Sequence, residues 1–289
     1  ARNGQGRFII AEADESDGSF LKLNSYIAVV TNIEDDHLDY YGTEENIYKA
    51  FKQFLGNLVE GGKAILCVDN AKVKALAQEI DKEVITYGLE EADYVAKDIC
   101  YGVDGTTYKL YHKDEFVTEV RLIVPGRHNV LNSVGAFVAA REMGIADETI
   151  LKALEQFGGA KRRFETKGKV NGVWVVDDYA HHPTEIEVTL KAARQTQPKR
   201  LLCLFQPHRY TRTQLLFKEF CNCFNDCDEV ILTAIYAASE NPIPGITSEA
   251  LAEGISKATG KAVTYIAKLP KAEEYLEAKA TAGDLILTV

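Results

Sequence analysis

The sequence has 289 residues, of which 46% are hydrophobic and 26% are charged, a composition typical of a globular protein. This length predicts two domains, with one large domain as the alternative. The formal net charge of −10 argues against a nucleic-acid partner, although a local basic pocket for an anionic metabolite remains compatible with it. No apolar run approaches the length of a membrane-spanning helix, so we expect no membrane partner.

Two apolar runs near the start, Phe8–Ala11 and Tyr26–Val30, are short and rich in Ile and Val, which favours buried strands of a parallel sheet. Acidic residues follow each run. Ligands collect at the carboxyl ends of such strands, so a magnesium site with an imidazole in its oxygen shell is predicted. The alternative is two solvated loops. The candidates are Glu12, Asp14, Glu15 and Asp17 after the first run, and Glu34, Asp35, Asp36, His37 and Asp39 after the second.

The next elements alternate between helix and strand. Apolar spacing predicts a helix over 44–58 with Thr43 as its N-cap. A buried strand at 63–68, a helix that runs to Ile80 and a short strand at 84–87 are expected to follow. Residues 94–124 alternate polar and apolar side chains, which predicts a small antiparallel sheet of two or three strands.

The motif PGRHNVLNS opens an Ala-rich helix that is expected to reach Met143. Asn129 and Asn132 are one helical turn apart, so both amides are candidates to bind an adenine or ribose edge. The alternative is that Asn129 is a simple N-cap. After a further helix over 147–157, a glycine-rich and basic joint predicts a boundary between domains 1–159 and 160–289.

The second half repeats strand and helix regularly, which predicts a right-handed, mostly parallel sheet of the Rossmann-like type. We therefore predict the α/β fold class, with a parallel-sheet domain that carries a small antiparallel sheet, followed by a Rossmann-like domain. Strands are expected at 173–176, 200–205, 229–233, 262–266 and 284–289, and helices from Pro183, from the region after Thr213 to about Phe224, and over 248–258 and 270–280.

Two polar segments, DDYAHHP and QPHRYTRT, follow strands of this half. His181 in the first is a candidate general base near neutral pH. Arg209 and Arg212 in the second are three residues apart, so on a first helical turn both can face one anion beside the positive helix end. The alternative is that the two arginines are surface ion-pair partners.

The sequence opens directly into an apolar run and stops within DLILTV, which reads as a buried strand. We therefore expect a piece of a longer protein. Cys221, Cys223 and Cys227 match no standard zinc spacing. The other three cysteines, Cys67, Cys100 and Cys203, are scattered, and a reducing cytoplasm fits this cysteine usage best.

Six motifs in this order, EADESDGSF, TNIEDDHLD, GRHNVLNS, RRFE, DDYAHHPTE and FQPHRYTRT, resemble the Mur ligases of bacterial cell-wall synthesis, and most closely their alanine-adding branch. Each motif is weak alone, but their order along almost the whole chain is specific. The resemblance implies three domains, which bind UDP-sugar, ATP and the amino acid. This chain would hold the later part of the ATP-binding domain and most of the last domain. The UDP-binding domain and the P-loop are missing from the sequence, so the chain alone is expected to be inactive.

The resemblance also implies roles for single residues. It implies that Glu12 and His37 are magnesium ligands and that Asn132 is an adenine-binding amide. It implies that Arg163 and Asp178 reach the nucleotide when the domains close. The residues that it implies line the amino-acid region are Tyr179, His181, His208, Arg209 and Arg212. His181 and Arg163 are the catalytic candidates among them.

The implied activity is ATP-dependent ligation of L-alanine to UDP-N-acetylmuramate through an acyl phosphate, with ATP and magnesium bound. Three alternatives stand beside it: a sister ligase that adds another amino acid or a peptide, a folylpolyglutamate synthase, and a non-catalytic nucleotide-binding module. The segment HRYTRT argues against the synthase, and DESD and DDYAHHP favour the alanine branch. A P-loop encoded upstream of Ala1 would separate the ligase from the binding module.

Overall fold

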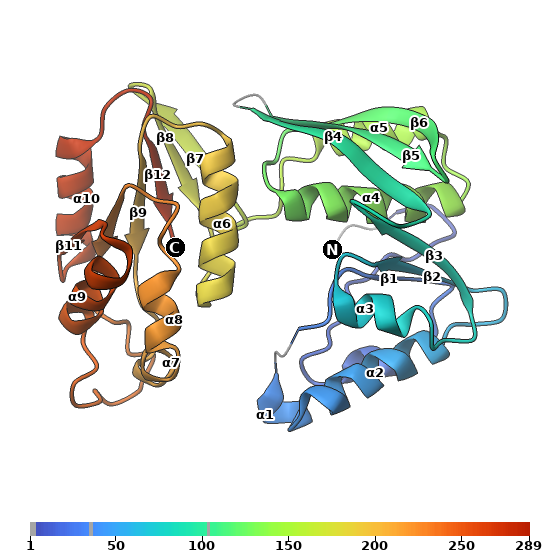
Figure 1. Ribbon diagram of the computed structural model, residues 1–289, viewed down its shortest axis with the longest axis horizontal. Helices are drawn as coiled ribbons and strands as arrows, with labels where there is room; N and C mark the ends of the chain where they lie inside the picture. The colour runs from blue at the N-terminus through green and yellow to red at the C-terminus, as the bar shows by residue number, and fades with distance from the viewer. Residues whose placement is uncertain (1–3, 35–36, 103–104) are drawn as a thin grey trace. The chain divides into compact units, whose positions relative to one another are not determined.

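The computed structural model describes residues 4–34, 37–102 and 105–289, and the side chain of Asp39 lies outside that description. Two acidic candidates for the metal site, Asp35 and Asp36, are therefore not among the described residues. The chain divides into two compact units (Figure 1). The first comprises residues 1–98, 108–120 and 130–152, and the second comprises residues 99–107, 121–129 and 153–289.

The first sheet holds its six strands in sequence order. Its first three strands run parallel, and the third pairs in parallel with the start of the fourth through Tyr87 and Tyr94. Only two residues of sequence separate β4 from β5 and β5 from β6, too few for a parallel crossover, so these strands are antiparallel. The parallel and antiparallel parts thus form one continuous sheet. The strands are β1 (Ile27–Val30), β2 (Lys63–Cys67), β3 (Glu83–Gly88), β4 (Tyr94–Gly102), β5 (Gly105–His112) and β6 (Glu115–Leu122).

Helices of this half begin where the sequence offers caps. Thr43 and Asn70 accept hydrogen bonds from backbone amides three residues on, as N-caps do. Ile47 and Phe54 of α2 pack with Val30 of β1 in one hydrophobic core. The helical elements are η1 (Ser19–Lys22), α1 (Leu38–Tyr41), α2 (Glu44–Gly56), α3 (Ala71–Leu76), α4 (Arg127–Glu142) and α5 (Asp147–Gln156).

The expected strand at Phe8–Ala11 is wrong. These residues form no strand, and Ile9 and Ile10 are 95% and 84% exposed. An extended segment becomes a strand only where its backbone groups find ladder partners. In the described chain β1 pairs with β2 alone and ends the sheet, so the segment finds no such partners.

The second sheet has the order β11-β10-β9-β12-β8-β7. Every neighbouring pair is parallel except β7 with β8. This mostly parallel α/β arrangement confirms the predicted fold class. The strands are β7 (Glu165–Val170), β8 (Val173–Asp177), β9 (Leu201–Phe205), β10 (Glu229–Leu232), β11 (Ala262–Tyr265) and β12 (Leu285–Thr288).

Helices cover both faces of this sheet. One face packs against α6, α8 and α9 through residues such as Leu190, Phe220 and Leu251. The other face packs against α10 through Ala272 and Leu276. The helices are α6 (Pro183–Gln195), α7 (Tyr210–Leu215), α8 (Phe217–Asn222), α9 (Ser248–Thr259) and α10 (Leu269–Lys279).

The single helix expected after Thr213 is instead two short helices, α7 and α8, divided at Leu216. The backbone of Leu216 has φ −109° and ψ 23°, outside helical values. Leu215 is 79% exposed, whereas Leu216 and Phe217 both pack against the core. The division of the helix thus lies where Leu216 and Phe217 pack against the core.

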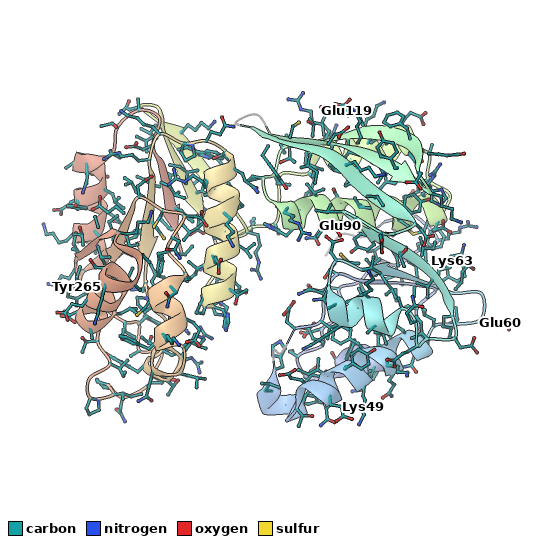
Figure 2. The ribbon with its side chains drawn as sticks, in the orientation of Figure 1. Lys49, Glu60, Lys63, Glu90, Glu119 and Tyr265 are labelled. Carbon is teal, nitrogen blue, oxygen red and sulfur yellow. The ribbon has the colours of Figure 1, made fainter. Side chains whose placement is uncertain are left out.

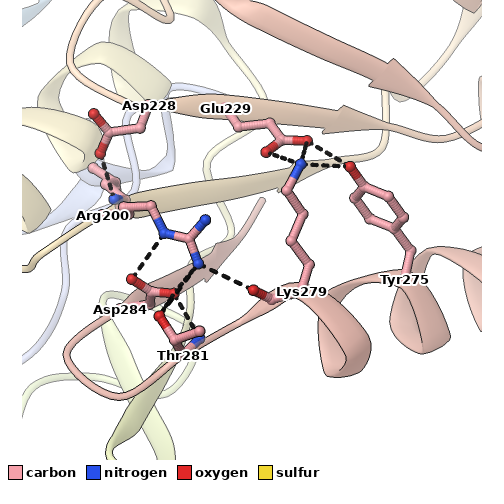
Figure 3. Close-up of polar contacts among 8 residues, drawn as sticks. Arg200, Asp228, Glu229, Tyr275, Lys279, Thr281 and Asp284 are labelled. Carbon is pink, nitrogen blue, oxygen red and sulfur yellow. Dashed lines mark hydrogen bonds and ion pairs between the residues drawn. The ribbon is translucent and has the colours of Figure 1, made fainter.

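Paired charges close the end of the second sheet where β9, β10 and β12 begin (Figure 3). The Asp284 side chain is fully buried and accepts hydrogen bonds from the Arg200 guanidinium and from the Thr281 amide. Burial opposes ionisation of Asp284, but these bonds outweigh it and lower its pKa. Glu229 beside it accepts bonds from Lys279, Tyr275 and Thr264. Both carboxylates are therefore satisfied inside the unit.

We expect Asp284→Ala to lower the free energy of unfolding of the second unit by about 2–3 kcal/mol. This value lies below the range for a fully buried pair because Arg200 is 33% exposed. Urea unfolding followed by the fluorescence of Trp174, the single tryptophan, measures it. Lys271→Ala removes a surface pair with Glu274 and should cost less than about 0.5 kcal/mol. Equal losses of unfolding free energy in the two variants would contradict a stabilising role for the buried Asp284–Arg200 pair.

Candidate functional site

The carboxyl ends of β8, β9 and β10 lie at one edge of the second sheet, because these strands run in the same direction. In sheets of this kind ligands bind at that edge, where the strand order reverses. Here β12 is inserted between β8 and β9. Polar side chains gather there from the joint before β7 and from the loops and first helical turns that follow β8, β9 and β10. We refer to them as the carboxyl-edge cluster: Arg163, Asp178, Tyr179, His181, Glu185, His208, Arg209, Arg212 and Glu240.

Asp178 fastens the joint before β7 to the end of β8. Its carboxylate accepts hydrogen bonds from the amides of Phe164 (2.7 Å) and Ala180 (2.8 Å). The amide of Tyr179 in turn donates to the carbonyl of Arg162 (2.7 Å). Burial raises the pKa of Asp178, although both amide bonds and the Arg163 charge act against that rise. Both carboxylate oxygens are therefore engaged by the backbone of this unit.

These bonds hold a strained turn. Arg162 and Phe164 have φ values of 58° and 48°, in the left-handed region that residues with a side chain rarely adopt. The guanidinium of Arg162 lies 4.5 Å from the ring centroid of Tyr179, a cation–π contact. The Arg163 side chain is 58% exposed, with Nη1 3.9 Å from Glu185 Oε1. The turn thus buries Phe164 and leaves Arg163 available to a ligand.

His181 has a defined tautomer. Its Nδ1 lies 3.0 Å from the carbonyl oxygen of Tyr179, and a carbonyl can only accept, so Nδ1 carries the hydrogen. Glu185 accepts from the amides of His181 and His182 and closes the capping box of α6. In the neutral ring the remaining nitrogen, Nε2, has a lone pair that can take a proton. This geometry suits the general-base role predicted for His181.

His208 and Arg212 lie together, with the Arg212 guanidinium 3.5 Å from His208 Nδ1. The ring of His208 also stacks on Tyr236 at 5.5 Å between centroids. Burial lowers the pKa of His208, and the charges of Arg212 and Arg209 lower it further. Near neutral pH His208 is therefore an uncharged acceptor beside two cations.

The predicted anion site at the start of α7 differs in one respect from what the structure shows. Arg209 is the N-cap and Arg212 lies in the first turn, as the spacing requires. However, α7 has only six residues, and the amide and hydroxyl of Thr211 both donate to the Glu240 carboxylate at 3.0 Å and 2.6 Å. A protein carboxylate thus already caps this helix, and the guanidinium groups remain as the anion-binding groups.

Glu240 was absent from the predicted site. It lies 29 residues after Thr211, in the loop between β10 and α9. The sequence marks that loop only by Pro242 and Pro244, which reveal an irregular connection and not where it folds. The same loop lines a cavity of about 430 Å³ with Tyr210 and Tyr265 (Figure 2 labels Tyr265).

In the first unit, the structure places His37 beside Glu15, with Nε2 3.4 Å from Oε1. Both line a small cavity of about 180 Å³ together with Thr31, Asn32 and Glu34. Glu12 lies in an exposed segment three residues before Glu15. The assignment of Glu12 and His37 as magnesium ligands stays a prediction.

Two other acidic candidates have structural roles. Asp14 and Asp17 accept hydrogen bonds from the amides of Ser16 and Ser19, as turn-forming carboxylates do. No group of three or more His, Cys, Asp or Glu side chains within the described ranges is arranged to hold a metal ion. The donors that line the small cavity with His37 are nevertheless oxygen atoms and one imidazole, which suit magnesium by type.

Asn129 and Asn132 differ in their surroundings. The Asn129 side chain donates to the carbonyl of Pro125 (2.7 Å) and so closes the turn before α4. Asn132 is exposed on α4 and is the better placed of the two to meet a ligand. Its predicted contact with adenine is not tested by these contacts.

The fold and the cluster define a class of protein: a two-part α/β protein whose second sheet carries histidine, arginine and carboxylate groups at its carboxyl edge. Two family models match the chain, the Mur ligase middle domain over residues 2–140 and the Mur ligase glutamate ligase domain over residues 162–289. Together the two matches cover most of the sequence. The chain belongs to the Mur ligase family.

Close relatives carry one name. The chain is 49% identical to the UDP-N-acetylmuramate–L-alanine ligase of Desulforamulus reducens over 100% of its own length and 63% of that protein. It is 47% identical to the ligase of the same name from Syntrophus aciditrophicus, with 100% and 60% covered. The crystal structure of the Thermotoga maritima UDP-N-acetylmuramate–alanine ligase superposes with a TM-score of 0.79 at 25% identity, over 96% of this chain and 59% of that one.

The chain thus spans about 60% of the length of these relatives. Within the part of the chain that the structure describes, no helix has the length and apolar character to cross a membrane.

We expect Asp178→Ala to destabilise the second unit by about 2–4 kcal/mol, because the amides of Phe164 and Ala180 lose their acceptor in a buried place. Trp174 contacts the ring of Phe164 at 5.9 Å, so its fluorescence reports unfolding and the local position of the turn. Glu187→Ala, which removes an exposed partner of Lys191 on α6, is the matched control and should cost less than about 0.5 kcal/mol. A loss for Asp178→Ala no larger than the control's would refute the role of this carboxylate.

Proposed function

We propose that this chain supplies the ATP-binding and amino-acid-binding parts of an enzyme that joins L-alanine to UDP-N-acetylmuramate in peptidoglycan synthesis. The carboxyl-edge cluster carries the proposal, because it sets two arginines and a histidine base around one edge in a chain of the Mur ligase family. The names of the relatives support the choice of L-alanine. We place the domain boundary between residues 159 and 160.

The reaction we propose has two steps. The terminal phosphoryl group of ATP passes to the carboxylate of UDP-N-acetylmuramate and gives an acyl phosphate and ADP. The amine of L-alanine then attacks the carbonyl carbon, the C–O bond to phosphate breaks, and phosphate leaves. The amine must lose a proton on the way, and a positioned base accelerates such a transfer by about 10²–10⁴-fold.

The described residues suit the second step. Arg209 and Arg212 offer planar donors to the carboxylate of L-alanine. His181 Nε2 is the acceptor for the ammonium proton, since Nδ1 is held as a donor by the Tyr179 carbonyl. Tyr179 is half exposed beside it and forms an edge contact with the imidazole ring, which keeps that ring oriented. His208 accepts from the Arg212 guanidinium at Nδ1, so in the neutral ring Nε2 carries the hydrogen and is a donor for a substrate oxygen.

Asn132, Arg163 and Asp178 are the proposed nucleotide-side residues. Exposed Asn132 suits an adenine edge, and exposed Arg163 suits a phosphate oxygen. For Asp178 the amide bonds to Phe164 and Ala180 support an indirect role, because they fix the turn that presents Arg163. Asp178 therefore acts on the nucleotide chiefly through the position of Arg163.

Magnesium is the proposed cofactor, with Glu12 and His37 as its ligands and Glu15 as a further oxygen donor beside His37. When bound, the ion supplies charge stabilisation to the transferring phosphoryl group. We propose a cytoplasmic location. The buried cysteines of α8 and the turn after it, Cys221, Cys223 and Cys227, form no disulfide, which fits a reducing compartment.

The test of the function uses the full product of the gene that encodes this sequence. ATP-dependent phosphate release is measured with UDP-N-acetylmuramate and a panel of L-alanine, glycine, D-glutamate and diaminopimelate, and separately with a folate and L-glutamate. Release that depends on both the UDP-sugar and L-alanine supports the proposal. Preference for another acceptor would assign a sister ligase, and release with a folate substrate alone would assign a folylpolyglutamate synthase. Nucleotide binding with no release under any condition would leave the non-catalytic module.

We expect Arg212→Ala in the full gene product to raise the KM for L-alanine by about ten- to a hundredfold, roughly 1.4–3 kcal/mol for a lost charge-assisted bond. The KM for ATP should change much less. Arg212→Lys should restore only part of the loss, because an ammonium cannot reproduce the planar fork. If the KM for ATP rose and the KM for L-alanine stayed unchanged, the two arginines would bind the nucleotide instead. If neither KM changed, they would be surface ion-pair partners.

We expect Glu12→Gln and His37→Ala each to lower turnover by about a hundredfold or more, because a lost contact to the metal removes several kcal/mol of transition-state stabilisation. Steady-state rates across a magnesium titration measure the effect. Glu60→Gln, an exposed carboxylate in the turn before β2 (Figure 2), is the control and should keep the wild-type rate. If both Glu12→Gln and His37→Ala kept near wild-type rates at low magnesium, the loops that carry them would be solvated loops without a metal site.

A further inference from the structure

The loop between β10 and α9 is fastened to segment 206–213 at its first end by the backbone. The amide of Arg209 donates to the carbonyl of Tyr236, and the amide of Tyr236 donates to the carbonyl of Pro207, both at 2.8 Å. The two segments thus form a short parallel bridge, and the rings of His208 and Tyr236 stack above it. This first fastening lies on the amino-terminal side of Arg209.

Glu240 makes the second fastening, on the other side of Arg209. Its carboxylate accepts from the amide of Thr211 through Oε2 and from the hydroxyl of Thr211 through Oε1. The loop reaches this position through Ala238 and Ser239, whose φ values of 46° and 73° are left-handed. Conformations of this kind persist only where surrounding contacts over-determine them.

Arg209 lies between the two fastenings and is itself strained, with φ 72° and ψ 138°. Its carbonyl accepts from the hydroxyl of Thr213 (2.8 Å). The β10–α9 loop binds the Arg209 amide through Tyr236 and the Thr211 amide through Glu240. A backbone fixed in this way sets the direction of the Arg209 side chain, which precedes α7, and of the Arg212 side chain within it.

The negative charge of Glu240 also acts on the two arginines and on His208. Hydrogen bonds from the Thr211 side chain and amide, and then the Arg209 charge, lower the pKa of Glu240, so it stays ionised near neutral pH. Its field also reaches Arg212 and His208. The carboxylate therefore offsets part of the repulsion between the two guanidinium groups when no substrate carboxylate is present.

We infer that Glu240 is a positioning residue for the incoming amino acid: through Thr211 it holds Arg209 and Arg212 in the arrangement that binds the amino-acid carboxylate. This inference rests on the function proposed above and adds the residue that organises its acceptor site. Glu240 does not touch the reacting atoms. Its loss should therefore weaken binding of the amino acid and leave the rate of the phosphoryl-transfer step nearly unchanged.

The first test is kinetic and uses the full gene product. Glu240→Gln and Thr211→Val should each raise the KM for L-alanine about tenfold, with kcat and the KM for ATP within about threefold of wild type. Thr211→Ser keeps the hydroxyl and should stay close to wild type. Glu253→Gln makes the same charge change at an exposed position of α9 and is the control. A KM for L-alanine in Glu240→Gln equal to the control's would overturn the inference.

The second test needs no ligase activity and uses the chain as given. The pKa of His208 is measured by NMR titration of its ring. Charged or titratable groups that face it are Arg209 and Arg212 at the start of α7, His181 after β8, and Tyr236 and Glu240 in the β10–α9 loop. Because Glu240 raises this pKa, Glu240→Gln should lower it and Glu253→Gln should leave it unchanged.

The two tests separate the possible failures. If the wild-type gene product ligates no amino acid, the proposed function fails and Glu240 loses its amino-acid role, whatever the titration shows. If the wild type ligates L-alanine but Glu240→Gln has the same KM for L-alanine as Glu253→Gln, the function stands and the positioning role is refuted, whatever the titration shows. A raised KM together with a lowered His208 pKa supports both.

Discussion

Parallel pairing of β8, β12, β9 and β10 is the constraint on which the candidate site depends. It forces the loops after these strands to the same edge, so segments far apart in the sequence meet there. His181 follows β8, Arg212 lies in the first turn after β9, and Glu240 lies in the loop after β10, yet all three are close enough to His208 to act on its pKa. Helices pack on both faces of the sheet and keep the strands in register.

The two ends of this sheet use charge differently. At the end where the strands begin, Asp284 and Glu229 have partners for their oxygens within the unit, and the contacts stabilise the fold. At the carboxyl edge, the arginines are only partly compensated and the backbone is strained at Arg162, Phe164, Arg209, Ala238 and Ser239. Strain that is held in place by side-chain carboxylates, here Asp178 and Glu240, is typical of a site prepared for a ligand.

Local signals in the sequence predicted much of the fold. Thr43 and Asn70 start helices as N-caps, and the alternation of apolar strands with helices after Val173 gives the observed sheet. The strand at Phe8–Ala11 was wrong because an apolar run does not reveal whether a sheet edge is present to receive it. The bend at Leu216 was missed because the point where a helical segment divides is decided by its packing against the core.

The site was predicted less completely than the fold. The spacing of Arg209 and Arg212 indicated a shared direction, and the Asn129 and Asn132 pair was visible in the motif. Which carboxylate holds which loop depends on tertiary approach, so the links from Asp178 to Phe164 and from Glu240 to Thr211 left no signal in the spacing of residues. The tautomer of His181 is likewise fixed by a carbonyl whose position only the fold determines.

The central claim is that the carboxyl edge of the second sheet receives the amino acid. A crystal structure of the full gene product with ADP and UDP-N-acetylmuramoyl-L-alanine tests it most directly. The account predicts that the alanine carboxylate lies within about 3 Å of a guanidinium nitrogen of Arg209 or Arg212, in hydrogen-bond geometry. It also predicts that the alanine nitrogen faces the Nε2 side of His181. An alanine carboxylate bound away from both arginines, with a phosphate in their place, would contradict the account.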